Sequence, residues 1–424
     1  MKILMITNTY LPIVGGLEKS IQSFTHKLRE WGHDVQIVVP QLEGMETTEE
    51  NVIRIPAFHQ LKQTGFAVAL PIFASLAKVI DSFQPDVIHA HHPFLMGEMA
   101  LRLAARYGKP LVFTYHIMFD QYSHYFPIPS SLSRRFLVEL AVGYANLSTR
   151  VIAPSQSVRE ILQVEGVRSF IDVVPTGVDV QAFASGDREK KRDELGIPKN
   201  AFILGYVGRL AVEKNLEFLA DAVIGFMKSH KNAHFLVIGK GPSEEVIKKL
   251  FRQAGIENRL HPIGVVQGKA LADCYHAMDV FVFASKSETQ GMVLCEAMAA
   301  GVPVIAIDAP GVREVVKDEK NGRLLARENS AEFYSALSWC LDRNKREWER
   351  LREGARETAQ VFSVENCTRD ALQVYEKAAV GNLLPTTREQ SEWRRMMRRL
   401  NIEWKIVANV GRATGLALSE IITS

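Results

Sequence analysis

The chain has 424 residues, of which 47% are hydrophobic and 23% are charged, and its formal net charge is +3. This length exceeds one ordinary domain, and the composition is that of a soluble globular protein. So small a net charge gives no reason to expect a nucleic-acid partner. No apolar run approaches about 20 residues, which excludes a transmembrane helix.

The first residues and the cysteines indicate the compartment. The N-terminal MKILMIT predicts a buried strand instead of a signal peptide, because no small-residue cleavage site follows it. The four cysteines show no CxxC spacing and lie in apolar or helical surroundings, so we expect reduced thiols rather than disulfides or metal ligands. They are Cys274, Cys295, Cys340 and Cys367. A cytoplasmic protein is therefore expected.

Short β-rich runs alternate with helical segments in the first part of the chain. Strands are predicted at Ile3–Thr7, Val35–Val39, Val87–Ala90, Leu111–Thr114, Val151–Ala153 and Val173–Val174. Helices are predicted between them at Leu17–Trp31 and Phe94–Arg106. Non-alternating apolar strands separated by helices indicate a parallel sheet that is covered on both faces.

The same alternation then starts again. Strands are predicted at Ile203–Val207, Phe235–Ile238, Leu260–Ile263, Val280–Phe283, Val302–Ile305 and Gly322–Leu325, and helices at Leu216–Ser229, Glu244–Gln253, Lys269–Ala277 and Leu294–Ala300. Two doubly wound, Rossmann-like α/β domains are therefore expected, at residues 1–182 and 183–362. The polar stretch Ser185–Glu194 is interpreted as part of their junction.

The last part of the chain lies outside this repeated pattern. A helix is predicted at Ser363–Ala379, and a basic extension follows at residues 381–424. In the extension, apolar residues recur at spacings of three and four and form one helical stripe with basic residues on other faces. The stripe consists of Trp393, Met396, Met397, Leu400, Trp404 and Val407. Such a helix suits an anionic membrane surface, docking on the protein body or an oligomer contact, and the sequence leaves these open.

The stretch Ser287–Ala306 carries the strongest chemical signal. Glu288 lies in a polar turn and Glu296 lies on the small-residue helix that follows. The helix N-terminus can offer N–H groups and a favourable dipole to a phosphate, and carboxylates can accept hydrogen bonds from sugar hydroxyls. A buried helix with two solvated glutamates is the plainer alternative.

Cations and glycines follow the first strand of each half. Gly15 and Gly16 precede a helix, where a backbone can approach a phosphate closely, although an ordinary turn explains them equally well. Arg209 and Lys214, in GRLAVEK, follow the strand Ile203–Val207. At a carboxyl sheet edge they can bind a diphosphate and neutralise it as a leaving group, whereas the plainer alternative is a solvated basic loop.

His116 follows the strand Leu111–Thr114 and is a candidate catalytic or acceptor-positioning residue, with Asp120 and Tyr122 in the same loop. The nearby IHAHHP run contains His89, His91 and His92. No acidic or cysteine ligand shares a suitable spacing with them, so a metal site is not expected there.

Together these motifs resemble those of the retaining glycosyltransferases of family 4. This GT-B group includes phosphatidylinositol mannosyltransferases, sucrose synthase and bacterial glycolipid glucosyltransferases. The resemblance covers nearly all of residues 1–380 and rests on five motifs in order. They are Gly15–Gly16, Pro175–Asp179, Gly208–Lys214, Gly239–Pro242 and Glu288–Glu296. It implies two Rossmann-like domains that face a central cleft, with the helix at 363–380 crossing back to the first domain.

The resemblance also implies a role for each matching residue. The catalytic set consists of His116, Arg209, Lys214 and Glu288. The donor-binding set consists of Gly15, Gly16, Arg209, Lys214, Val265, Glu288, Gln290, Gly291, Met292, Val293 and Glu296. Within it, Arg209 and Lys214 hold the diphosphate, Glu296 holds the ribose and Gly16 donates to the distal phosphate. Val265 or Val266 flanks the base.

The implied reaction retains the anomeric configuration by front-face substitution, in which the leaving phosphate deprotonates the acceptor. No cofactor or obligatory metal is expected, because no DxD motif lies near a strand end. The turn Glu288–Gly291 and the loop Tyr115–Phe126 resemble the branch that glucosylates diacylglycerol. That branch implies UDP-glucose and a lipid acceptor, although Ile117 departs from its usual small polar residue.

A lipid acceptor would need a docking surface at the inner face of the membrane. The apolar loop His59–Leu70 and the segment Phe126–Val138, with Arg134 and Arg135, are candidates beside the C-terminal helix. An ordinary packed helix is the equal alternative for the second segment. A soluble sugar acceptor, GDP-mannose as donor, a sugar-nucleotide epimerase and a non-catalytic binding protein are the rival functions. The oligomeric state stays open.

Overall fold

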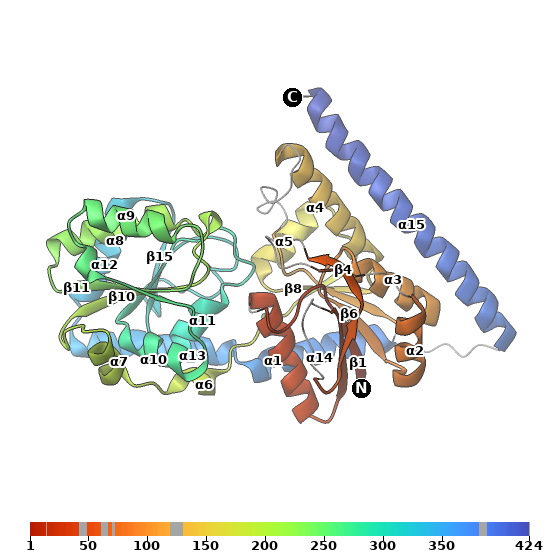
Figure 1. Ribbon diagram of the computed structural model, residues 1–424, viewed down its shortest axis with the longest axis horizontal. Coiled ribbons are helices and arrows are strands. Elements are labelled where there is room, and N and C mark those ends of the chain that lie inside the picture. Colours follow the sequence, from red (N-terminus) through yellow and green to blue (C-terminus); the bar gives the residue numbers. More distant parts are fainter. Residues whose placement is uncertain are drawn as a thin grey trace. The chain divides into compact units, whose positions relative to one another are not determined.

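The computed structural model describes residues 1–13, 15–41, 49–60, 67–69, 73–118, 130–380 and 388–423. The chain forms two compact units (Figure 1). Unit 1 combines Met1–Pro175 with Cys367–Ser424, and unit 2 is Thr176–Asn366. The division falls seven residues before the boundary that the sequence suggested at residue 182.

Unit 1 is built on a seven-stranded parallel sheet of order β3-β2-β1-β6-β7-β8-β9. The strands are β1 (Lys2–Ile6), β2 (Asp34–Pro40), β3 (Val52–Ile55), β6 (Val87–Ala90), β7 (Leu111–Thr114), β8 (Arg150–Ala153) and β9 (Phe170–Val173). A separate antiparallel pair joins β4 (Ala57–Gln60) to β5 (Ala67–Ala69).

Both faces of this sheet are buried, because its strands alternate between two hydrophobic cores. Ile3 and Met5 of β1 enter the core under α1 (Gly16–Glu30) and α14 (Val364–Val380), while Leu4 and Ile6 enter the other. That second core lies under α2 (Phe73–Phe83), α3 (Met96–Tyr107), α4 (Ser130–Leu147) and α5 (Gln156–Val164). Burial of each large aliphatic side chain contributes about 1.5–3 kcal/mol, so a continuous apolar strand is stable only with helices on both sides.

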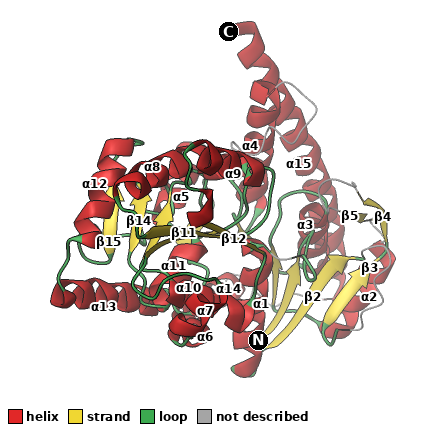
Figure 2. Ribbon diagram, turned by 60° about the vertical axis from the view of Figure 1, so that its left-hand side comes forward, coloured by secondary structure: helices red, strands yellow, loops and turns green. Residues whose placement is uncertain are grey.

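Unit 2 repeats the plan with a six-stranded parallel sheet of order β12-β11-β10-β13-β14-β15. The strands are β10 (Phe202–Val207), β11 (Ala233–Ile238), β12 (Leu260–Gly264), β13 (Val280–Phe283), β14 (Val304–Ile307) and β15 (Gly322–Leu325). One face carries α8 (Leu216–Ser229), α9 (Glu244–Gln253) and α12 (Ser330–Leu341) (Figures 1 and 2). The other carries α10 (Gly268–Ala277), α11 (Met292–Ala299) and α13 (Lys345–Val361) (Figures 1 and 2).

The strand order places a topological switch in each sheet. In unit 1 the chain winds outward from β1 to β3 and then returns to β6 on the other side of β1. In unit 2 it does the same around β10, with β13 as the returning strand. Open α/β sheets bind ligands where the carboxyl ends of two such strands diverge. The predicted doubly wound α/β class is confirmed, and these two edges are where a site is expected.

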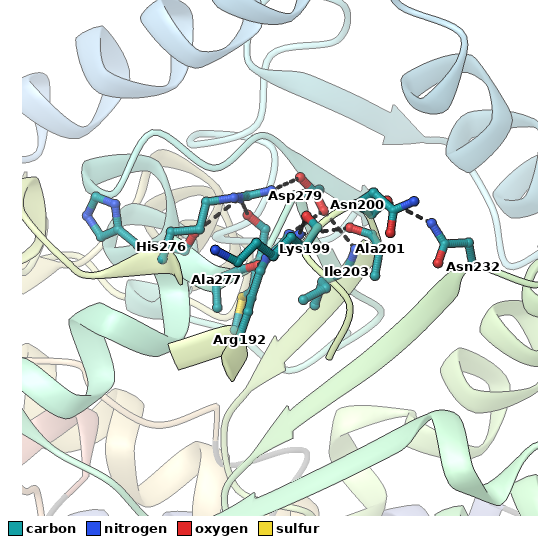
Figure 3. Close-up of polar contacts among 11 residues, drawn as sticks. Arg192, Lys199, Asn200, Ala201, Ile203, Asn232, His276, Ala277 and Asp279 are labelled. Atoms are coloured by element: carbon teal, nitrogen blue, oxygen red, sulfur yellow. Dashed lines mark hydrogen bonds and ion pairs between the residues drawn. The ribbon is translucent and has the colours of Figure 1, made fainter. Parts of the chain in front are cut away.

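The polar stretch Ser185–Glu194 is a correction to the sequence interpretation. Instead of a junction, it contains α7 (Arg188–Glu194), which belongs to unit 2. Arg192 of this helix is 2% exposed, donates to the carbonyl of Ala277 and pairs with Asp279 Oδ2 at 2.8 Å (Figure 3). Most charged residues of this stretch are exposed, and the sequence pattern does not distinguish the buried Arg192 from them.

Two predicted strands are also shifted. A strand was expected at Val173–Val174, but β9 spans Phe170–Val173. The run Val302–Ile305 was expected as a strand, but β14 spans Val304–Ile307. The amide of Val302 still donates to Ala297 of the preceding helix, and Pro303 follows it, so the chain cannot join the sheet until two residues later.

The C-terminal helix α15 (Arg388–Thr423) packs along α4 and α3 of unit 1 (Figure 1). Arg102 Nε donates to Glu403 at 2.8 Å, and Asn409 Nδ2 donates to the carbonyl of Leu140 at 3.2 Å. Of the three alternatives for the extension, docking on the protein body therefore holds for one face of the helix. Within the described ranges, no helix combines the length and hydropathy needed to cross a bilayer.

Candidate active site

The loops after β10 and β13 meet at the switch point of unit 2. Lys214 Nζ lies 2.6 Å from Glu288 Oε1, and both side chains are about 15% exposed. Ser287 Oγ also donates to the carbonyl of Glu213, and Asn215 Nδ2 donates to the carbonyl of Ala284. The structure thus brings together the cation and the acid that the sequence placed 74 residues apart.

Arg209 is held by a carboxylate of its own loop. Its guanidinium pairs with Glu213, four residues on, whose side chain is 5% exposed. The second oxygen of that carboxylate, Oε2, is buried and has no hydrogen-bond partner among the described residues. Sequence reasoning missed Glu213, although its i, i+4 spacing from Arg209 in GRLAVEK is a usable signal.

Glu296 is a buried acid on α11. Its side chain is 3% exposed, and Tyr275 donates its hydroxyl to Oε2 at 2.8 Å. Burial and the nearby Glu296 charge raise the pKa of Tyr275 well above its ordinary value, so the hydroxyl keeps its proton. Tyr275 comes from α10, and nothing in its sequence context pointed to this partner. A carboxylate placed this way is a directed acceptor, and the alternative of a solvated glutamate is wrong for Glu296.

The turn before α11 is fixed by backbone geometry. Gly291 caps the helix with φ 70°, a left-handed conformation that glycine adopts without strain. The Gln290 amide is bound to Thr176 through both its oxygen and its nitrogen. Met292 and Val293 begin the helix, and Gly311 packs so closely that an added Cβ would lie 2.6 Å from the Gln290 nitrogen. The Gln290 side chain is thus structural, while the turn presents its backbone at the helix N-terminus.

Glycines let the neighbouring loops approach each other. A Cβ added to Gly239, which has φ 136°, would lie 1.9 Å from the carbonyl oxygen of Gly208. Gly208 in turn donates its amide to Ile238 at 3.0 Å, and Leu210 donates to Lys240 at 3.0 Å. The GxGP motif therefore supports the loop that carries Arg209.

The predicted base-flanking residue follows β12. Val265 is 62% exposed just beyond Gly264, whereas Val266 packs against the core of unit 2. Of the two candidates, Val265 is the more exposed.

In unit 1, the glycine pair begins α1. Gly15 occupies the N-cap position, where it has no side chain to accept a capping hydrogen bond. Gly16 is the first helical residue. Thr9 Oγ1 donates to Glu18 Oε1 at 2.5 Å, and a Cβ on Gly15 would lie 2.6 Å from the other oxygen of that carboxylate. A side chain at position 15 would therefore require the Glu18 carboxylate to move.

His116 is partly buried and contacts one of three buried histidines. His91 Nδ1 lies 3.0 Å from His116 Nε2, and the rings stack with centroids 5.3 Å apart. His89 contacts the hydroxyls of Tyr375 and Thr114 at 2.8 and 2.7 Å. Burial, reinforced by the other histidines, lowers the pKa of both His91 and His116 well below the ordinary value. His116 is therefore neutral and its ring is oriented by His91.

The loops after β1 and β6 are joined across the switch point of unit 1. His92 Nδ1 accepts from the amide of Asn8 at 3.2 Å, and Asn8 Oδ1 accepts from the amide of Met96 at 3.0 Å. The described residues contain no group of three His, Cys, Asp or Glu side chains placed to hold a metal ion. Histidines of the IHAHHP run therefore bind other protein groups.

The predicted acceptor residues are only partly described. Asp120 and Tyr122 lie outside the described residues, as do parts of the segments 59–70 and 126–138. Arg134 is exposed on α4, and Arg135 pairs with Glu139 at 2.5 Å.

Two family models match the chain, one on each half. Glycosyltransferase Family 4 matches residues 14–182, and Glycosyl transferases group 1 matches residues 187–358. Together they include the loops described above in both units.

Named relatives align with most of the chain. An alpha-monoglucosyldiacylglycerol synthase of Acholeplasma laidlawii is 29% identical over 76% of this chain and 84% of its own length. A GDP-mannose-dependent alpha-mannosyltransferase of Mycobacterium tuberculosis is 30% identical over 76% of this chain and 83% of its own length.

Solved structures share the fold. HepE of Anabaena, in complex with UDP, has a TM-score of 0.72 at 23% identity and covers 89% of this chain and 100% of its own. Sucrose-phosphate synthase of Thermosynechococcus elongatus has a TM-score of 0.76 at 20% identity and covers 90% and 99%. These likenesses confirm the GT-B fold that the motifs predicted.

Proposed function

The chain belongs to the family 4 glycosyltransferases and is a hexosyltransferase, and we propose that it transfers glucose from UDP-glucose to a membrane lipid of the diacylglycerol type. The main observation in favour of a nucleotide-sugar donor is the Lys214–Glu288 ion pair at the switch point of unit 2, where Lys214 lies in the loop that also contains Arg209. The acceptor half is supported by the likeness to the monoglucosyldiacylglycerol synthase.

The donor diphosphate lies against Lys214 and Arg209. Without donor, the charge of Lys214 is balanced by Glu288, and that of Arg209 by Glu213. A diphosphate competes for both cations, and a bidentate guanidinium contact adds geometric specificity. As the glycosidic bond breaks, negative charge grows on the leaving phosphate and both cations stabilise it.

The sugar and the ribose are held by acids. Glu288 is released from Lys214 as the phosphate takes its place, and it accepts from a hydroxyl of the donor sugar. Glu296, oriented by Tyr275, accepts from the ribose hydroxyls. The amides of the Gln290–Met292 turn, at the N-terminus of α11, complete the phosphate site.

Unit 1 supplies His116 and the glycine pair. A neutral His116 can hydrogen-bond a sugar hydroxyl through its ring without introducing a charge. The amide of Gly16 at the start of α1 donates to the distal phosphate. These groups act by positioning, and the leaving phosphate takes the acceptor proton in a front-face substitution that retains the configuration. No metal is required for this step.

The proposed site of action is the cytoplasmic face of an anionic membrane, where a lipid acceptor presents its hydroxyl. Mannosyl transfer from GDP-mannose is the second candidate, because a relative of that name is 30% identical to this chain.

A transfer assay separates the candidates. Purified protein is given radiolabelled UDP-glucose or GDP-mannose with vesicles that contain diacylglycerol and an anionic lipid. We expect label from UDP-glucose in the lipid phase, no such transfer with Lys214→Ala, and normal transfer with Lys190→Ala, whose side chain is 70% exposed on α7. Label arriving only from GDP-mannose would replace the donor assignment, and a product only with a water-soluble acceptor would replace the lipid.

A further inference from the structure

The C-terminal helix α15 is docked on unit 1 by one face. Ile406, Ala413 and Ala417 are 9% exposed or less. Asn409 fits where Gly143 leaves room, since an added Cβ on this glycine would lie 1.6 Å from Asn409 Oδ1. Arg412 Nη2 lies 3.5 Å from Glu139, which fixes the helix further. The orientation of α15 on unit 1 is therefore set by specific contacts.

The opposite face carries an exposed apolar stripe. Leu400, Trp404 and Val407 are 60%, 72% and 63% exposed, and their spacings of four and three place them on one side of the helix. Gly411 and Gly415 continue that side, with open space where a Cβ would be. A contiguous apolar stripe exposed on a firmly docked helix marks a contact surface.

The charge of the helix identifies the occupant. Between Arg388 and Arg412 there are seven basic and three acidic residues; of these, Glu403 is paired with Arg102 and Arg412 with Glu139. Lys405 is exposed next to Trp404. Tryptophan beside basic residues suits the headgroup region of an anionic bilayer. A second copy of the chain would bring two such basic segments together, which repel each other.

We propose that the outer face of α15, formed by Leu400, Trp404 and Val407, binds the surface of an anionic membrane. The inference deepens the proposed function and rests on it for the lipid acceptor, because it names the surface by which the enzyme reaches that lipid. The helix lies along the surface while its inner face stays on α3 and α4.

Vesicle co-sedimentation of the full chain without donor tests this directly. Vesicles of phosphatidylcholine mixed with phosphatidylglycerol are compared with phosphatidylcholine alone. We expect Leu400→Ser/Trp404→Ser/Val407→Ser to bind the anionic vesicles about tenfold more weakly or worse, since three apolar side chains no longer insert. Val164→Ser is the matched control, because Val164 is 88% exposed at the end of α5 and should not matter.

Substitution is preferred to truncation, because deleting α15 would uncover the α3 and α4 surface on which it packs. If the triple variant unfolds, Trp404→Phe replaces it, with brominated lipids as the probe. Quenching of tryptophan fluorescence in the wild type that falls in this variant supports insertion. Unchanged vesicle binding by the triple variant, or quenching that Trp404→Phe does not reduce, overturns the proposal.

A subunit contact is recognised by light scattering after size exclusion. A dimer that the triple variant converts to a monomer, with vesicle binding retained, assigns the face to a second copy and overturns the membrane assignment. Transfer to short-chain diacylglycerol dispersed in detergent is measured in parallel. This assay needs no vesicle, so loss of transfer in it means that the proposed function is wrong. Loss of the membrane assignment alone would leave this transfer unchanged.

Discussion

Lys214 Nζ lies 2.6 Å from Glu288 Oε1, and these residues come from the two loops that flank the switch point between β10 and β13. The pair keeps a cation and an acid at the carboxyl edge of the sheet, where ligands of open α/β folds bind. A phosphate that binds Lys214 would take the place of the Glu288 carboxylate as its anionic partner. The carboxylate would then be available as a hydrogen-bond acceptor.

Lys214→Ala should therefore reduce turnover by about 100-fold or more, the cost of removing one group that stabilises charge in a transition state. Glu288 keeps some contact with water, so the free energy of unfolding should fall by no more than about 1–2 kcal/mol. Turnover is measured with the preferred donor and stability by urea denaturation. Near-normal turnover would remove Lys214 from the phosphate site.

Glu296→Ala should weaken UDP binding by about tenfold or more, because hydrogen bonds to a charged acceptor are lost. Tyr275→Phe removes only the hydroxyl that orients Glu296 at 2.8 Å, so its effect should be smaller and in the same direction. Isothermal titration calorimetry with UDP compares the two variants with the wild type. An unchanged affinity in Glu296→Ala would count against the ribose assignment.

Gly239→Ala should destabilise unit 2 by at least about 2 kcal/mol, from strain at φ 136° and a clash with the Gly208 carbonyl oxygen. Gly255→Ala is the matched control. Gly255 has φ 71° but open space around an added Cβ, so this variant should cost about 1–2 kcal/mol from the backbone alone. Equal losses in urea denaturation would show that the close approach of the two loops is unimportant.

Stability should fall as the pH falls below about 6.5. Burial lowers the pKa of His89 and of His92 to about 3, whereas the unfolded chain titrates near 6.5. Below pH 6.5 the unfolded state therefore binds protons that the folded state does not, which favours unfolding. Each histidine should cost about 2 kcal/mol between pH 7 and pH 5.

Urea denaturation of His89→Gln at these two pH values isolates one histidine. Its pH dependence should be weaker than that of the wild type, whereas His26→Gln should leave the dependence unchanged because His26 is 76% exposed. The same dependence in all three proteins would show that His89 is not buried as a neutral ring.

Arg192→Ala should destabilise unit 2 by about 3–5 kcal/mol, because it removes the guanidinium that donates to buried carbonyls and one of the donors to the Asp279 carboxylate (Figure 3). Lys190→Ala on the same helix should change the stability little, since its ion pair is exposed. Thermal unfolding followed by circular dichroism compares the two variants. Similar midpoints would mean that α7 is not anchored by Arg192.

Much of the fold could be predicted from the sequence, because both sheets are parallel and buried on both faces. Continuous apolar runs mark such strands directly, and β6, β7, β13 and β15 match their predicted ranges. The first edge strand of unit 1, β3 (Val52–Ile55), was not predicted. It is short and only partly buried, so its apolar pattern is weak.

The charged residues of the site could be predicted for a different reason. Strand-end positions place Arg209, Lys214 and Glu288 at one sheet edge regardless of loop detail. Their partners could not be predicted in the same way. Tyr275 contacts Glu296 from the last turn of another helix, and His91 meets His116 only because β6 and β7 are neighbours. Contacts of this kind depend on packing, which local sequence patterns do not carry.

The order of the chain has a consequence for synthesis. Unit 2 begins and ends with segments that pair with each other, since the amide of Val178 donates to the carbonyl of Phe362 and the amide of Val364 donates to the carbonyl of Val178, both at 2.9 Å. Its sequence leaves the ribosome before most of the helix α14, which buries Tyr375 against one face of the unit 1 sheet. The second unit can therefore complete its core while the first still exposes an apolar sheet face. Unit 1 is therefore synthesised first but completes its folding last, and chaperones would bind its exposed apolar sheet face.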